Sequence, residues 1–89
     1  MKIKSGFVVR KIANQYMAVP VGARAKELHG MLGLNETAAF IWELLKEDRT
    51  EEELAALLYE EYEISEEHAL ETIKKFIEQL RNERVLEDE

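Results

Sequence analysis

The spacing of hydrophobic and polar positions differs between the two halves of the chain. Up to residue 34, short runs of β-branched, aromatic and other apolar residues are separated by glycine or by a small polar turn. The runs 7–12, 16–21 and 29–34 therefore predict three strands. A tight turn at 13–15, where Asn14 tolerates a positive φ, predicts that the first two strands form a hairpin. Residues 23–28 are compatible with a loop or with a single helical turn.

From Leu34 onward the apolar residues recur at helical spacing, with almost no glycine. The spacing predicts one helix over 36–46, a second that starts at Thr50, and a third that follows Ser65 and ends near Glu83. The apolar stripes are Leu34, Ala38, Ile41, Trp42 and Leu45, then Leu54, Leu57, Leu58 and Tyr62, then Ala69, Ile73, Phe76, Ile77 and Leu80. Val85 and Leu86 are expected to close the core.

Capping residues mark where these helices begin. Asn35 and Ser65 are good N-caps, and Thr50 with Glu53 has the spacing of a capping box. The order of three strands followed by three helices predicts an α+β fold in one domain over residues 1–89. An antiparallel three-stranded sheet followed by a trihelical unit also describes a winged helix-turn-helix-like architecture.

Composition and charge narrow the possible partners. The chain has no cysteine and no apolar run long enough to span a bilayer, and no apolar segment follows Met1–Ser5 as in a signal peptide. We therefore expect a cytoplasmic protein. Residues 1–35 carry a net charge of +5 and residues 36–89 a net charge of −12. The acidic helical half repels phosphate, so nucleic acid is not expected as a partner.

No catalytic constellation is visible in the sequence. His29 and His68 are far apart, and no spacing of histidine or carboxylate residues is typical of a metal site. The carboxylates of 51–53 and 66–67 fall in first helical turns, where compensation of the helix dipole explains them. We therefore expect a protein that is not an enzyme and that holds neither metal nor cofactor.

The third predicted strand has an unprotected edge. Edge strands are usually protected by charge or proline, yet His29–Leu34 carries neither, and Gly30 and Gly33 leave room for another backbone. Three outcomes remain open: the protein covers this edge itself, a second copy pairs with it, or a peptide adds to it as a strand. The apolar stripe of the last helix is expected mainly to form the core. Because the stripe is broad, part of it is able to line a groove between strand three and this helix.

The residues also resemble a known family. The segments Gly6–Arg10, Val19–Gly22, Gly30–Leu45, Thr50–Leu54 and Tyr62 resemble the PqqD family, most specifically through the Leu-Asn-x-Thr-Ala-x-x-Ile-Trp pattern that starts at Leu34. The chain departs from the family at Arg84 and at Asp48-Arg49, where the family often has glycine. These departures leave open whether the pathway makes pyrroloquinoline quinone or another peptide product.

The resemblance implies a non-catalytic peptide chaperone. Such proteins bind the leader of a ribosomally made precursor peptide and present it to a modifying enzyme, often a radical S-adenosylmethionine protein. The leader adds as a strand beside strand three, against the last helix. The implied peptide-binding residues here are His29, Gly30, Met31, Leu32, Gly33 and Leu34, with Ile73, Ile77, Leu80 and Arg81 on the helix, the last four placed by spacing.

Two other functions are compatible with the fold. A winged-helix DNA-binding protein needs a basic recognition helix, whereas the third predicted helix carries five acidic residues between Glu66 and Glu83. A structural module would pair strand three with its own copy in a homodimer. A monomer and a homodimer are both compatible with the leader-binding hypothesis.

Overall fold

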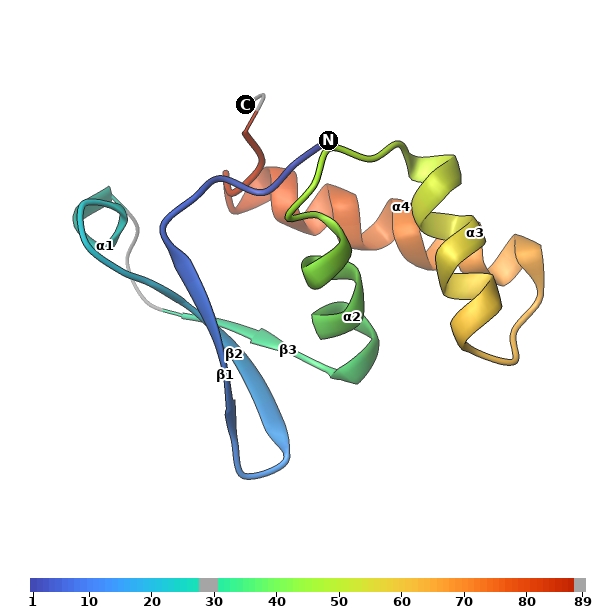
Figure 1. The fold of residues 1–89 in the computed structure, drawn as a ribbon, viewed down its shortest axis with the longest axis horizontal. Helices are drawn as coiled ribbons and strands as arrows, with labels where there is room; N and C mark the ends of the chain where they lie inside the picture. Colours follow the sequence, from blue (N-terminus) through green and yellow to red (C-terminus); the bar gives the residue numbers. More distant parts are fainter. Residues whose placement is uncertain (28–30, 88–89) are drawn as a thin grey trace. The chain divides into compact units, whose positions relative to one another are not determined.

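The computed structural model describes residues 1–27 and 31–87. These residues form two compact units, one of residues 4–40 and the other of residues 1–3 with 41–89. The first holds the sheet and the second holds most of the helical residues (Figure 1). The α+β order of the prediction is confirmed, with strands first and the long helices after them.

The sheet unit is an antiparallel meander. Strands β1 (Phe7–Ile12), β2 (Gln15–Pro20) and β3 (Leu32–Leu34) lie in the order β1-β2-β3. The predicted hairpin is confirmed, with Ile12 opposite Gln15. The turn differs in one detail, because the positive φ of 57° belongs to Ala13 and not to Asn14. Strand β2 begins and ends one residue earlier than the predicted run 16–21, and it ends at Pro20, which cannot donate to a ladder.

A single helical turn, α1 (Arg24–Glu27), follows the hairpin. Of the two alternatives for residues 23–28, the helical one is therefore observed. Gly6 is required beside it: its φ is +95°, and an added Cβ would lie 2.9 Å from the Cβ of Arg24. The Nε of Arg24 donates to the carbonyl of Ser5 at 3.1 Å, which ties this turn to the start of β1.

Strand β3 is shorter than predicted. It covers Leu32–Leu34, and Met31 precedes it outside regular structure. The predicted strand residues His29 and Gly30 lie outside the described residues. The pairing of β3 with β2 is short for a physical reason. Strand β2 ends at Pro20, whose nitrogen has no hydrogen to donate to a longer β3.

Three longer helices follow: α2 (Glu36–Leu44), α3 (Glu51–Glu61) and α4 (Glu66–Asn82). The N-cap predictions are confirmed. The Ala38 N–H donates to Asn35 Oδ1 at 2.7 Å, and the His68 N–H donates to Ser65 Oγ at 3.0 Å. Helix α2 ends two residues earlier than predicted, at Leu44, and a turn follows it.

The predicted apolar stripes supply most of the buried side chains, although Ala38, Leu57 and Tyr62 are only half-buried. Helix α4 buries its complete stripe, and Val85 and Leu86 are buried after it, as predicted. Ile3 pairs with Leu86 as an isolated β-bridge, which ties the first residues of the chain to the last described ones. The fully buried large side chains are Trp42, Ile41, Leu45, Leu54, Leu58, Ile73, Ile77, Leu80, Leu86 and Val85.

Helix α4 ends in a Schellman motif at the position where the family often has glycine. Arg84 takes the left-handed conformation, with a φ of 58°. The N–H groups of Val85 and Arg84 donate to the carbonyls of Leu80 and Arg81, at 3.2 and 3.0 Å. A side chain at such a position is strained, because glycine alone takes the left-handed conformation without a steric cost.

Replacing Arg84 with glycine is therefore expected to raise the free energy of unfolding, by up to about 1 kcal/mol. Urea denaturation of the two proteins measures the difference. Arg84→Ala is the control, since it removes the charged side chain but keeps the left-handed strain. Equal stability of the glycine and alanine variants would show that the backbone conformation is not the cause.

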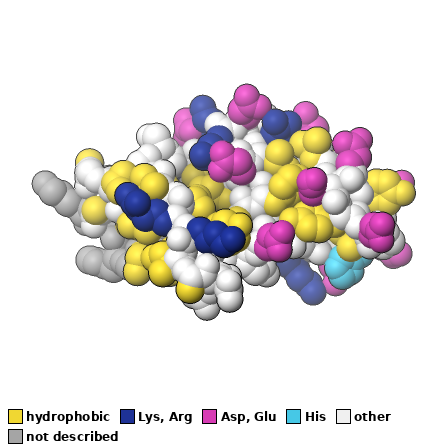
Figure 2. Space-filling view, turned by 60° about the horizontal axis from the view of Figure 1, so that its bottom comes forward, with side chains coloured by type: hydrophobic (Ala, Val, Ile, Leu, Met, Phe, Trp, Pro, Cys, Tyr) yellow, Lys and Arg dark blue, Asp and Glu magenta, His cyan; other side chains and the backbone are white. Residues whose placement is uncertain are grey.

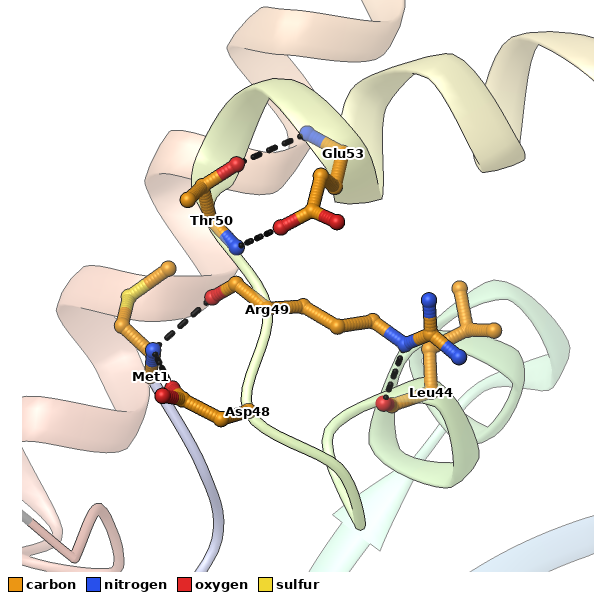
Figure 3. A network of polar contacts seen from close by, with 6 residues as sticks. All are labelled: Met1, Leu44, Asp48, Arg49, Thr50 and Glu53. Carbon is orange, nitrogen blue, oxygen red and sulfur yellow. Dashed lines mark hydrogen bonds and ion pairs between the residues drawn. The ribbon is translucent and has the colours of Figure 1, made fainter.

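A polar network fixes the connection between α2 and α3 (Figure 3). The ammonium group of Met1 donates to Asp48 Oδ1 at 2.6 Å and to the Arg49 carbonyl at 2.8 Å. Arg49 Nε donates to the carbonyl of Leu44 at 2.9 Å, which satisfies a free acceptor at the end of α2. The predicted capping box is confirmed. The Glu53 N–H donates to Thr50 Oγ1 at 3.1 Å, and the Thr50 N–H donates to Glu53 Oε1 at 2.9 Å.

The capping box makes stability depend on pH. The hydrogen bond from the Thr50 backbone lowers the pKa of Glu53 below its ordinary value of 4.5. A carboxyl group with a lowered pKa stabilises the fold above its unfolded pKa, and this contribution is lost as the pH falls through the folded pKa. Between about pH 6 and pH 3, the wild type is expected to lose more stability than Glu53→Gln, whose amide oxygen still accepts the Thr50 N–H. Urea denaturation at the two pH values tests this, and equal losses would contradict it.

Candidate peptide-binding edge

The pairing register of the sheet determines which backbone groups of β3 point outward. A two-residue turn makes Ile12 and Gln15 a hydrogen-bonded pair, and such pairs alternate along the ladder. The Val21 N–H donates to the Gly6 carbonyl at 2.8 Å, as this alternation requires. Tyr16 and Ala18 therefore direct their N–H and C=O groups toward β3, where they face Leu34 and Leu32.

Gly33 consequently directs its N–H and C=O away from β2. Met31, two residues before it, is expected to direct its N–H and C=O to the same side. Gly33 is exposed, and 56% of the Met31 surface is accessible. Among the described residues, no strand lies beyond β3 and no hydrogen bond reaches these outward groups. Within the sheet unit, β3 therefore has an edge that is able to accept a further strand.

The side chains of β3 point to the two faces of the sheet. Leu34 is buried, at 5% exposure, and Leu32 is half-buried. Gly33 contributes no side chain to the opposite face, where a Cβ would lie 4.0 Å from the sulfur of Met17. The exposed surface next to the edge is consequently small and apolar, and it leaves space for another backbone.

The residues predicted on the last helix divide into two groups. Ile73, Ile77 and Leu80 are buried in the helical unit, at 0%, 1% and 0% exposure. Arg81 lies on the same helix and is exposed. A direct contact of these residues with a peptide stays a prediction. The burial shows that the three apolar side chains are core residues in the unliganded chain.

The described part of the chain contains no cluster of metal-binding side chains. No group of three or more histidine, cysteine, aspartate or glutamate residues there could hold a metal ion. His68 is an exposed residue in the first turn of α4, and His29 is outside the described residues. Among residues 1–27 and 31–87, no helix has the length and apolar character needed to cross a bilayer.

The charge is divided between the two units. By sequence, residues 4–40 carry a net charge of +3, and residues 1–3 with 41–89 carry −10. Figure 2 shows acidic side chains spread among hydrophobic ones over one face of the helical unit. This distribution gives the helical unit a negative field, which favours basic over acidic partners.

Sequence reasoning identified strand three but not the residues whose backbone faces outward. The decisive signal is the length of the turn, because this length determines the hydrogen-bonding parity of every later pair. The sequence predicts a turn of three residues at 13–15, whereas the structure has two residues between Ile12 and Gln15. Using that signal requires the exact ends of the strands. The pattern of apolar residues does not give these ends to within one residue.

These features define a class: a small α+β protein in which a three-stranded meander with an open edge precedes three helices. The solved structure "TbiB1 in Complex with the TbiA(beta) Leader Peptide" is similar to this chain, with a TM-score of 0.74 and 24% sequence identity. The match covers 98% of this chain and 95% of the other. It confirms the fold class.

The family is shown by a sequence comparison. The model of the family "Coenzyme PQQ synthesis protein D (PqqD)" matches residues 25–86, which is more than half of the chain. The chain belongs to the PqqD family. No match was found among the curated proteins.

Proposed function

We propose that this chain is a non-catalytic adaptor that binds the leader segment of a ribosomally synthesised precursor peptide. The leader adds as a strand to the outer edge of β3, next to Met31 and Gly33. The observation that carries the proposal is the register of β2 with β3, from which we infer that Gly33 directs its N–H and C=O outward, on an edge without a described partner. Main-chain hydrogen bonds supply affinity, and the apolar residues beside the edge select side chains.

Family membership and the fold support this proposal. The similar solved structure, TbiB1, is a complex with a leader peptide, and it covers nearly the whole of this chain. The adaptor's second partner is a peptide-modifying enzyme, of which a radical S-adenosylmethionine protein is the type that the family suggests. The product is pyrroloquinoline quinone or another modified peptide. The adaptor works in the cytoplasm, where precursor peptides are made.

Peptide selection tests the function and does not require the natural precursor. Random linear peptides of about 20 residues, displayed on their own mRNA, are selected on the immobilised chain. We expect enriched peptides that bind with Kd values of about 1 µM or below. On binding, hydrogen exchange of the Met31 and Gly33 amides is expected to slow, because a guest strand takes up their N–H groups.

Two results would overturn the proposal. In the first, the selected peptides slow exchange only outside residues 31–34. In the second, light scattering of the chain alone shows a dimer whose formation protects the same two amides and excludes peptide. The edge would then serve homodimerisation. A short peptide gene next to the gene of this chain would supply the natural probe for the same measurement.

A further inference from the structure

Helices α3 and α4 pack against each other and leave an open groove between them within the helical unit. Its volume is about 430 Å³, and its exposed lining is mostly apolar. The groove is separate from the β3 edge, which belongs to the sheet unit. The lining residues are Glu52, Ala55, Ala56, Tyr59, Glu60, Glu66 and Leu70.

The lining has an apolar floor and an acidic rim. Ala55, Ala56 and Tyr59 lie on one face of α3, and Leu70 of α4 is opposite them. Tyr59 is 45% exposed, so the groove presents a large apolar side chain to solvent. Glu52, Glu60 and Glu66 are exposed at the rim.

The charge around the groove specifies the occupant. Helix α3 carries five glutamates and no basic residue. Within the described part of the chain, no ion pair neutralises Glu52, Glu60 or Glu66. An apolar floor between unneutralised carboxylates is complementary to a segment that has apolar residues on one side and lysine or arginine on the other.

The shape of the groove specifies the conformation of that segment. It is formed by two helices and offers no strand edge, so a guest is unable to add to it by main-chain hydrogen bonds. An amphipathic helix fits such a site, with an apolar anchor at i and i+3 or i+4 in the groove and basic residues at the rim.

We propose that the α3–α4 groove is a second docking site, which binds a basic amphipathic helix of a protein partner. The site lies in one unit and does not depend on peptide capture at β3. It gives the chain a way to hold a partner while the sheet edge holds its own guest.

A synthetic helix tests the proposal. The probe is a peptide of about 14 residues, or roughly four helical turns, with leucine on one face and lysine on the other. We expect a Kd of about 10 µM at about 150 mM salt, measured by fluorescence anisotropy. We also expect amide chemical-shift changes concentrated at residues 52–60 and 66–70.

Matched variants separate the groove from general attraction to an acidic protein. Tyr59→Ser removes the largest apolar side chain of the floor and is expected to weaken binding about tenfold. Glu60→Lys, at the rim, is expected to weaken it about fivefold, whereas Glu78→Lys makes the same charge change on α4 outside the groove and is expected to change it less than twofold. Ile12→Ser, a comparable exposed apolar change in the sheet unit, is expected to have no effect.

Several results would overturn the proposal. Equal losses from Glu60→Lys and Glu78→Lys would show attraction to the whole helical unit only. Equal affinity for a peptide in which glutamate replaces lysine would show that the acidic rim does not select a basic partner. Self-association of the chain that Tyr59→Ser abolishes, together with no binding of the probe, would assign the groove to a second copy.

Discussion

The Gly33→Pro variant is expected to lose binding of the selected peptides by about thirtyfold or more, which corresponds to about 2 kcal/mol. Proline removes the outward N–H of Gly33 and places a ring on the edge where the guest backbone must approach. The change is compatible with the fold, because Gly33 does not donate to β2 and because Leu32, the preceding residue, is already extended.

Gly33→Ala is the matched control for this variant. It retains the outward N–H, and its Cβ would be in ordinary contact with Met17, at 4.0 Å from the sulfur. Its affinity is expected to remain within about threefold of the wild type. Circular dichroism and urea denaturation establish that both variants are folded. Retained binding by a folded Gly33→Pro protein would mean that peptides use another edge.

The register also shows which nearby proline substitution is unsuitable as a test. Leu32 forms a hydrogen-bonded pair with Ala18, so proline at Leu32 removes a bond of the sheet itself. Met31 has the outward parity of Gly33 and precedes the strand, so Met31→Pro is the second informative variant. Agreement between Met31→Pro and Gly33→Pro would locate the guest strand along the edge.

The Ile77→Ala variant is expected to lower the free energy of unfolding by about 2–5 kcal/mol. Ile77 is 1% exposed, so the substitution removes buried methylene groups and leaves a cavity in the helical unit. A small domain is stable by about 5–15 kcal/mol, so the loss is a large part of the total. Urea denaturation monitored by the fluorescence of Trp42 measures it.

Arg81→Ala separates peptide contact from core packing on the same helix. Arg81 is exposed, so the change is expected to cost less than about 1 kcal/mol of stability. Peptide affinity is then measured where both variants are folded. A fall for Ile77→Ala beyond about threefold would show that its side chain reaches the guest, and the helix would then contribute the apolar wall that the sequence predicts.

Some features of this protein follow from the sequence alone because they depend on neighbouring residues. The N-caps at Asn35 and Ser65 and the capping box at Thr50 require only a side chain within three residues of a free N–H. The buried stripe of α4 follows from helical periodicity, and all five of its predicted residues are buried. The family follows from the order of short motifs.

Other features were decided only by the tertiary structure, because they depend on segments that are distant in sequence. The exact length of β3 and the outward direction of Gly33 follow from its pairing with β2, which residue type does not specify. The α3–α4 groove arises because Tyr59 and Leu70 line it from two different helices, which the sequence of either helix alone does not specify. Local chemistry thus determines where the helices begin, and packing determines the extent of β3 and which surfaces remain available to a partner.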